Sequence, residues 1–290
     1  MRVAVLGASG FVGRALVAEL GGHGHEVVAV ARSVRPGSDV EWIAADLADR
    51  RAAERALTGV DVAVHLVHSL GRADYERRDL VIAGNVTAAA GKCGVAQIVY
   101  LGGLGDDADD LSRHLRSRRE TALALARGPV PVTTLRAGMI VGRGSAAFET
   151  IVALVDRLPA MICPRWVSVP TQPIALADAV AYLAGVVGLD AALGDSYDVG
   201  GPEVMTYREM IDRIARIRGR SPWIVEVPVL TPRLSSWWLH LVTPVKASVA
   251  RPIVDGLRNP TIARDGRIRD LVPLELTSFD DAVREALATS

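Results

Sequence analysis

Residues 2–13, RVAVLGASGFVG, decide the fold of this chain. The apolar run from Val3 to Leu6 is typical of a short buried strand, and apolar residues recur at helical spacing from Phe11 onward. Between them lie three glycines in the order GxxGxxG. The first permits a tight turn, the second lets a pyrophosphate approach the backbone, and the third lets the helix pack closely on the sheet. Because a helix amino terminus attracts an anion, residues 7–13 are predicted to bind a dinucleotide.

Apolar runs alternate with helical stretches through the first half of the chain. After the first strand, runs at residues 27–31, 40–44, 60–67, 98–101 and 132–135 predict five further strands. Strands that are apolar along their whole length and separated by helices are typical of a parallel sheet covered on both faces. The sequence therefore predicts an α/β protein with a doubly wound parallel sheet of the Rossmann type.

The later part of the chain is less regular and richer in proline. We expect residues 1–142 to form the nucleotide-binding core, with a return to it around residues 174–200, and residues 143–290 to form mainly a small carboxy-terminal substrate lobe. Within this lobe, an apolar segment around Trp237 and Trp238 could be a lid over the site, a dimer face or a membrane-surface helix. The prolines in the segment disfavour the membrane helix, so burial against the core as a lid is the preferred interpretation.

Composition argues against several classes of protein. The chain has 33 basic and 33 acidic side chains, so no net field favours nucleic acid or an anionic membrane. Cys93 and Cys163 lie far apart without a Cys/His cluster, so neither a disulfide framework nor a metal site is expected. The first apolar run is too short for a signal peptide or a membrane span. We expect a cytoplasmic monomer or homodimer that acts on a small molecule and does not associate with membranes.

The end of the second strand indicates which dinucleotide is bound. NAD-specific sites usually carry an acid there for the ribose 2′-hydroxyl, but this chain has Ala31, Arg32 and Ser33. Arg32 can meet a 2′-phosphate, which favours NADP(H) over NAD(H); the alternative is a solvated arginine at a strand end. Asp46, after the third strand, could accept a hydrogen bond from the adenine amino group or could cap the following helix.

Later segments complete a family pattern. The chain resembles the extended or atypical short-chain dehydrogenase/reductase superfamily over about residues 1–230, through DVAVHLV at 61–67, NVT at 85–87, IVYL at 98–101, VTTLR at 132–136 and YDVGGP at 197–202. Shorter strings are similar to a bacterial subgroup of NAD(P)-binding proteins that bears the name nucleoside-diphosphate-sugar epimerase: LVHS at 66–69, YLGGLG at 100–105, HLRSR at 114–118 and LTPRLSS at 230–236.

The resemblance implies a set of cofactor-binding residues at the carboxyl ends of the strands. Joined to the glycine loop, this set comprises Gly7, Ser9, Gly10, Phe11, Val12, Gly13, Arg32, Asp46, Leu47, Leu66, Val67, His68, Leu101, Gly102 and Arg118. It also implies substrate contacts from the segments after the fifth and sixth strands and from the small lobe. These are Gly103, Gly138, Met139, Arg143, Trp166 and Gln172.

The catalytic residues of the superfamily are replaced in this chain. Active members use a Ser or Thr after the fifth strand and a Tyr with a Lys four residues later, where the lysine lowers the tyrosine pKa. Here Gly102 or Gly103 stands at the hydroxyl position, His114 at the tyrosine position and Arg118 at the lysine position. Either His114 is a substitute acid/base with Arg118 on the ribose, or the triad is lost and only cofactor binding remains. His68 is a second candidate proton donor, or a turn-capping residue.

Three functions follow from this pattern. The preferred one is an atypical short-chain reductase that uses NADP(H) on a small hydrophobic carbonyl or quinone-like substrate, because the apolar segment around Trp237 suits such a molecule. The competing one is a non-catalytic NADP(H)-binding regulator or assembly protein. A nucleotide-sugar epimerase or dehydratase is disfavoured, since the tyrosine and lysine are missing.

Overall fold

A computed structural model describes residues 1–34, 40–105, 110–227 and 255–288 of the chain. Its centre is a seven-stranded parallel sheet in the order β11-β6-β5-β4-β1-β2-β3. The strands are β1 (Arg2–Leu6), β2 (Glu26–Ala31), β3 (Glu41–Ala44), β4 (Val62–His65), β5 (Gln97–Gly103), β6 (Val132–Ala137) and β11 (Ser196–Val199). The chain adds strands on one side of β1 and then crosses to β4 and continues on the other side. The strand order therefore reverses between β1 and β4, where doubly wound sheets bind their ligands.

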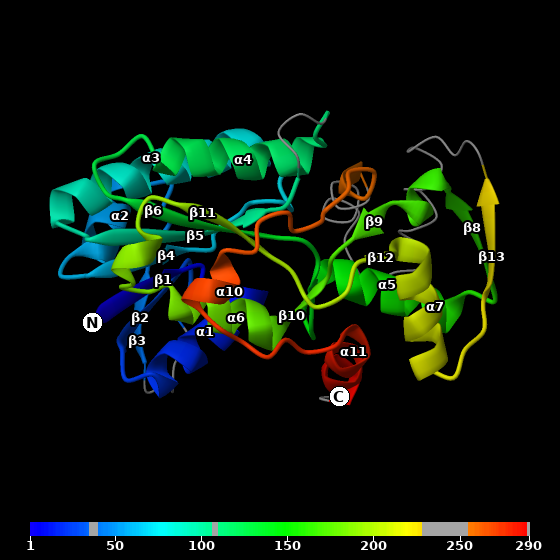
Figure 1. The fold of residues 1–290 in the computed structure, drawn as a ribbon. Coiled ribbons are helices and arrows are strands. Elements are labelled where there is room, and N and C mark those ends of the chain that lie inside the picture. Colours follow the sequence, from blue (N-terminus) through cyan, green and yellow to red (C-terminus); the bar gives the residue numbers. More distant parts are fainter. Residues whose placement is uncertain (35–39, 106–109, 228–254, 289–290) are drawn as a thin grey trace.

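Helices cover both faces of this sheet (Figure 1). One face carries α1 (Phe11–Gly22) and α6 (Leu176–Gly185), and the other carries α2 (Arg50–Leu57), α3 (Tyr75–Cys93) and α4 (Arg113–Leu125). Alternate residues of a strand enter the two cores: Val3 and Val5 pack in the cluster of α1 and α6, whereas Ala4 and Leu6 pack in the cluster of α2 and α3. This explains the continuous apolar runs of the central strands, and it confirms the predicted doubly wound parallel sheet.

Helix α3 begins several residues before the stretch in which apolar residues recur at helical spacing. Helical apolar spacing marks it only around residues 80–90, but the helix spans Tyr75–Cys93. Its first turns carry the charged side chains of residues 76–79, so apolar periodicity cannot reveal them. The helix ends at a glycine, as helices commonly do: Gly94 adopts the left-handed conformation with φ +73°.

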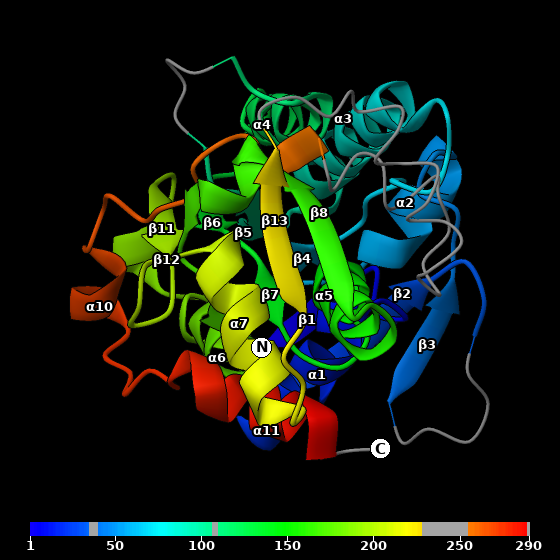
Figure 2. The same ribbon diagram turned by 90° about the vertical axis from the view of Figure 1, so that its right-hand side faces the viewer.

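The smaller lobe lies beyond the carboxyl ends of the strands (Figure 2). It contains α5 (Ala146–Arg157), β8 (Ala160–Pro164), the 3-10 turn η1 (Arg165–Ser168), α7 (Tyr207–Ile217) and β13 (Trp223–Val227). Strands β8 and β13 form a separate parallel pair. Short pairs join β7 (Ile140–Val141) to β10 (Ile174–Ala175), and β9 (Pro170–Thr171) to β12 (Met205–Thr206); a 3-10 turn η2 (Asp190–Ala192) precedes β11.

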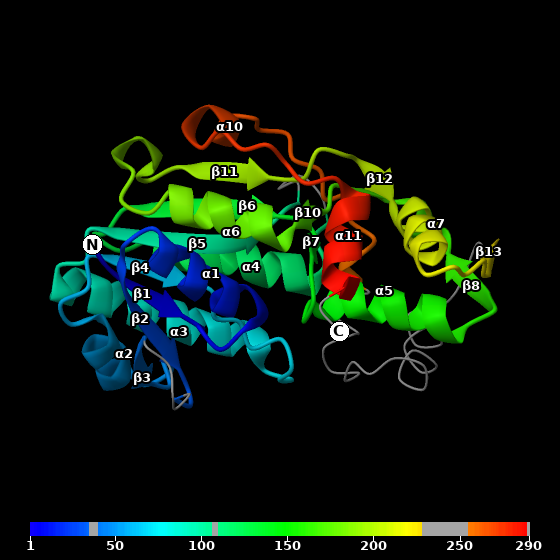
Figure 3. The ribbon, with the colours of Figure 1, turned by 90° about the horizontal axis from the view of Figure 1, so that it is seen from below.

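The carboxy-terminal part returns to the sheet before it ends in the lobe (Figure 3). Helix α10 (Ile268–Leu271) packs beside β11, and Ile268 is buried in the core cluster of α1 and α6. Helix α11 (Phe279–Ala288) then packs on α7.

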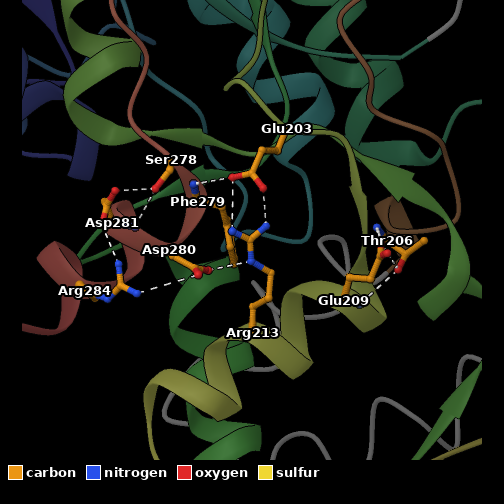
Figure 4. Close-up of polar contacts among 9 residues, drawn as sticks. All are labelled: Glu203, Thr206, Glu209, Arg213, Ser278, Phe279, Asp280, Asp281 and Arg284. Carbon is orange, nitrogen blue, oxygen red and sulfur yellow. Dashed lines mark hydrogen bonds and ion pairs between the residues drawn. The ribbon is translucent and has the colours of Figure 1, made fainter.

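One arginine joins the last helix to the lobe (Figure 4). Arg213 of α7 donates to Glu203 at 2.5 and 3.3 Å and to Asp280 at 2.7 Å, and its guanidinium lies 5.1 Å from the centre of the Phe279 ring. The same Glu203 carboxylate accepts the Phe279 backbone amide at 3.1 Å. These contacts fix α11 against α7 through buried and half-buried groups.

Candidate dinucleotide site

The glycine loop has the conformation that its spacing predicts. Gly7 adopts φ +96°, which favours glycine, and its amide donates to the Val30 carbonyl at 2.9 Å. The Gly10 amide donates back to the Gly7 carbonyl at 2.9 Å and closes the turn. A Cβ at Gly13 would lie 2.3 Å from the Gly7 carbonyl oxygen, so only glycine lets α1 pack this closely on the loop.

The amino terminus of α1 is bare. Its N-cap, Gly10, has no side chain to accept an amide hydrogen, and the first turn carries no acidic residue. The first amides of the helix are therefore directed outward without a side-chain acceptor, and the helix dipole is not compensated by an acid of the first turn. This is the arrangement that binds phosphate groups.

A pocket of about 430 Å³ opens beside this helix end, between the loop and the carboxyl ends of β2 and β4. It brings together nine of the predicted cofactor residues: Gly7, Ser9, Gly10, Arg32, Asp46, Leu47, Leu66, Val67 and His68. Ser69, which follows His68 in the LVHS string, also lines it, as do Arg72 and Arg78, which the sequence did not single out. A pocket of this volume, lined by the glycine loop and by the basic side chains of Arg32, Arg72 and Arg78, suits an anionic ligand such as a dinucleotide.

Asp46 and Arg78 form an ion pair in this pocket. The Arg78 Nη2 atom donates to both Asp46 carboxylate oxygens at 2.8 Å, and the Ala48 amide donates to the same carboxylate at 3.1 Å. The pKa of Asp46 is lowered, most strongly by the hydrogen bond from the Ala48 amide. The hydrogen bond and the positive charge of Arg78, and then the charge of Arg32, lower it further. Asp46 does not cap α2, as one interpretation of the sequence had it: the N-cap is Asp49, which accepts the Ala52 amide at 2.7 Å. Arg32 itself is exposed at the pocket wall.

Several predicted cofactor residues lie outside this pocket, among them Arg118, which lines a separate cavity of about 280 Å³ together with Gly102 and Gly103. Val12 and Gly13 pack α1 on the sheet, and the Phe11 ring lies near Gly142 and Gly144, at the start of the lobe. Leu101 is buried in the core, and Gly102 lies beside the Tyr100 ring.

Arg118 is buried at the end of β5, with 8% of its surface exposed. Its Nη2 atom donates to the Leu101 carbonyl, and its guanidinium carbon lies 5.1 Å from the centre of the Tyr100 ring. The Tyr100 hydroxyl donates to the Arg118 carbonyl at 3.0 Å, which fixes the helix against the strand. The Arg118 Nη1 atom is buried and has no hydrogen-bond partner among the described residues. A buried cationic donor without an acceptor fits a bound hydroxyl group.

Three histidines lie near this guanidinium. Burial and then the Arg118 charge lower the pKa of the half-buried His114 to about 4. Burial and Arg118 likewise lower the pKa of His65 to about 3; its ring is fully buried, 5.7 Å from the Tyr100 ring, and neither nitrogen has a described partner. The pKa of His68 is also lowered, first by the surrounding protein atoms and then by the charges of Arg118, His114 and His65. The His68 side chain is nevertheless exposed at the pocket. At neutral pH the rings of His65 and His114 are uncharged.

One buried acid of this region was not among the predicted site residues. Asp79 of α3 is 3% exposed, and its Oδ1 atom has no hydrogen-bond partner among the described residues. Burial raises the pKa of Asp79, while Ser69 and the Arg118 charge act in the opposite direction. A signal was present in the sequence, because Asp79 lies four residues after Tyr75 and three before Ile82, on the buried stripe of the helix.

The predicted substrate residues are dispersed. Gln172 is buried and its amide is fully engaged, since Nε2 donates to the Gly201 carbonyl at 2.7 Å and Oε1 accepts the Ala263 amide at 3.0 Å. Trp166 packs edge-on against Tyr207 at 6.2 Å. Gly103 lies beside the Leu115 side chain, and Gly138 lies beside the Gln172 and Thr261 carbonyls. Met139 packs against the hydrophobic cluster of the lobe, and Arg143 is exposed after β7. Trp237 and Trp238, the expected lid, lie outside the described residues.

Within the described ranges, no helix is both long enough and apolar enough to cross a membrane.

Comparison with known proteins gives the pocket a context. The model of the NAD dependent epimerase/dehydratase family matches residues 3–118. An uncharacterized protein of Mycobacterium tuberculosis is 45% identical over 103 residues, but these residues are 34% of this chain and only 12% of that longer protein. The (4-alkanoyl-5-oxo-2,5-dihydrofuran-3-yl)methyl phosphate reductase of Streptomyces griseus is 30% identical over 229 residues, 75% of this chain and 74% of that enzyme.

The solved structures agree on the fold. The triphenylmethane reductase of a Citrobacter species, crystallised with NADP(H), is similar over 99% of this chain and 100% of its own, with a TM-score of 0.78 and 19% identity.

Proposed function

Because this chain belongs to the short-chain dehydrogenase/reductase superfamily, with its amino-terminal part in the NAD-dependent epimerase/dehydratase family, we propose that it is an NADP(H)-dependent reductase of a small hydrophobic carbonyl or quinone-like compound. The observation that carries the proposal is the pocket itself, with a bare helix amino terminus on one wall and Arg32 on another. A dinucleotide with an additional 2′-phosphate matches both features.

The residues present fit such a cofactor. The loop amides and the first amides of α1 would hold the pyrophosphate, Arg32 would meet the 2′-phosphate, and the Arg118 Nη1 atom would donate to a ribose hydroxyl. When bound, the nicotinamide supplies a hydride to the substrate. Every other task, namely orientation, exclusion of water and delivery of a proton, belongs to side chains of the protein.

Reduction of a carbonyl to an alcohol also needs a proton at oxygen. His114 would supply it as a neutral imidazole N–H, because burial and the Arg118 charge hold its pKa near 4. A neutral imidazole can act as the proton donor to a developing alkoxide in a desolvated site. His68, at the pocket wall, is the second candidate for this role.

Relatives support the general reaction. The Streptomyces griseus relative is by name a reductase whose substrate carries an alkanoyl group, and the Citrobacter neighbour is by name a reductase that binds NADP(H). We take from them the class of reaction and not the compound.

A second candidate function rests on the missing tyrosine and lysine. His114 and Arg118 stand in their place, and a ring with a pKa near 4 is a weak acid at neutral pH. A protein that binds NADP(H) without turnover, as a regulator or assembly factor, would show the same pocket. A nucleotide-sugar epimerase or dehydratase is the least supported option for the same reason.

Calorimetric titration with NADPH and NADH tests the cofactor. We expect tighter binding of NADPH in the wild type, and Arg32→Ala should reduce that preference about tenfold or more, since a charged hydrogen bond is lost. Arg50→Ala, an exposed arginine on α2, is the matched control and should leave both affinities unchanged. Equal affinities for the two dinucleotides would refute the NADP(H) assignment.

Stopped-flow mixing with NADPH and a panel of carbonyl and quinone compounds tests turnover. We expect NADPH oxidation that is lost in His114→Ala and retained in the Arg50→Ala control. Tight NADPH binding without oxidation across the panel would favour the regulator.

A further inference from the structure

Two buried side chains of opposite charge each keep one polar atom without a partner. Arg118 of α4 is 8% exposed and Asp79 of α3 is 3% exposed. Among the described residues, the Arg118 Nη1 atom has no acceptor and the Asp79 Oδ1 atom has no donor. The first is an unused donor and the second an unused acceptor, in adjacent helices that pack on each other.

Among the residues that the structure describes, no acid is in direct contact with the Arg118 guanidinium. Its Nη2 atom is taken up by the Leu101 carbonyl, and its guanidinium lies against the Tyr100 ring, which is neutral. His65 and His114 are uncharged at neutral pH, because burial and Arg118 hold their pKa values near 3 and 4. Asp79 is the acid of this group, and the Arg118 charge is one of the influences on its pKa.

A buried arginine cannot shed its charge. The guanidinium remains protonated at any ordinary pH, so its burial requires a compensating negative charge nearby. Asp79 and Arg118 do not touch as an ion pair, yet their charges interact across the interior. A hydroxyl group can donate to the Asp79 Oδ1 atom and accept from the Arg118 Nη1 atom, so it would complete both sets of hydrogen bonds at once.

We propose that Asp79 is a positioning residue: its buried carboxylate holds the Arg118 guanidinium at the end of β5, in the orientation that presents Nη1 to the dinucleotide. The inference rests on the proposed function, because it assigns a task to Arg118 in cofactor binding. It adds a residue to the site that neither the motif spacing nor the resemblance identified.

A double-mutant cycle tests this assignment. The NADPH dissociation constant is measured by calorimetry for the wild type, Asp79→Asn, Arg118→Met and the double variant, with urea unfolding as a check of folding. Arg118→Met should weaken binding about tenfold and Asp79→Asn about fivefold, and the double variant should be no weaker than Arg118→Met alone, since residues that act as a unit are not additive. Asp79→Glu, which keeps the charge, should restore part of the affinity. Asp270→Asn is the control: Asp270 is an exposed acid of α10, outside the residues that line the pocket, and should change nothing.

A pH profile gives a readout that a structural role would not produce, and it needs no Asp79 variant. The groups that interact with Asp79 are Ser69, Arg78, Arg118, Tyr100 and Tyr75, and burial raises the Asp79 pKa from its usual range. Because burial raises the Asp79 pKa, its protonation should begin at a higher pH than for an exposed aspartate, and it should weaken NADPH binding in the wild type as the pH falls from neutral into the acid range. Arg118→Met should lose this part of the dependence, while the titration of the ligand's own phosphate remains in both.

The outcomes separate the two proposals. Additive effects in the cycle, or identical pH profiles for the wild type and Arg118→Met, overturn the role of Asp79 and leave the reductase proposal standing. A wild-type protein that binds neither NADPH nor NADH overturns both.

Discussion

Substitution of Gly13 tests the physical reading of the glycine loop most directly. An alanine Cβ at this position would lie 2.3 Å from the Gly7 carbonyl oxygen and 2.8 Å from the Ala8 Cα atom. Both are backbone atoms, so no side chain can rotate away to make room. Since real Cβ contacts are not found below 3.0 Å, helix α1 must move from the loop by about 0.7 Å.

The magnitude follows from two opposing effects. Overpacking of a close contact costs about 1–3 kcal/mol, and the upper part of this range applies because the obstacle is backbone. Alanine regains about 1 kcal/mol over glycine in a helix interior. We therefore expect Gly13→Ala to lower the free energy of unfolding by about 1–2 kcal/mol. It should weaken NADPH binding at least tenfold, since the phosphate-binding amides move with the helix and displacements of this size cost up to about 10²-fold.

The same helix supplies a control of opposite sign. Gly21 lies in the last turn of α1, and a Cβ there would meet nothing within 4 Å. Gly21→Ala should therefore raise the free energy of unfolding by up to about 1 kcal/mol and leave NADPH affinity unchanged. Urea unfolding and calorimetry on the two variants check both numbers. The reasoning is refuted if Gly13→Ala is as stable as the wild type and binds NADPH equally well.

Three further predictions concern the core, the last helix and the buried imidazole. Gln97→Leu removes a buried amide that makes three hydrogen bonds of 2.7–2.9 Å, and it should lower the free energy of unfolding in urea by about 2–4 kcal/mol because the former partners stay unpaired; a neutral effect would contradict this. The hydrogen bond from Arg213 lowers the pKa of Glu203, so the stabilisation is present above the unfolded pKa of about 4.3 and is lost as the pH falls through the folded value. Melting temperatures of the wild type and Glu203→Gln should accordingly differ at pH 7 and converge at acid pH, whereas a gap that persists at pH 3 would argue for packing instead. With a pKa near 4, His114 should cause no step in the turnover rate between pH 5.5 and 8, and a step near pH 6.5 that vanishes in His114→Ala would show a charged ring.

The sheet could be predicted because its physical cause is local. A strand segment buried on both faces is apolar at successive positions, as in residues 3–6 of β1, and this is visible in the sequence without any partner strand. The glycine loop is equally local, since the turn at Gly7 and the close packing at Gly13 depend on residues within one βα unit.

The interior of the site could not be predicted in the same way. The pairing of Asp46 with Arg78 joins residues 32 positions apart, and the compensation of Arg118 by Asp79 joins two different helices. Gln172 was predicted to contact the substrate, but its side-chain amide already has hydrogen-bond partners on both its nitrogen and its oxygen. The sequence alone cannot show such internal partners. Of these residues, only Asp79 could have been identified from the sequence, because it is an acid on the buried apolar stripe of its helix.

The uncapped start of α1 makes the protein's persistence depend on its supply of dinucleotide. A helix whose first amides have no side-chain acceptor is completed by a phosphate group, so the bound nucleotide acts as a replaceable piece of the fold. By mass action, a nucleotide present at a hundred times its dissociation constant adds about 2.7 kcal/mol to stability. Under the proposed NADP(H) binding, a cell that depletes its NADP(H) pool would leave more of this protein open to proteases. The abundance of the protein would then follow the supply of the dinucleotide even when no substrate is turned over.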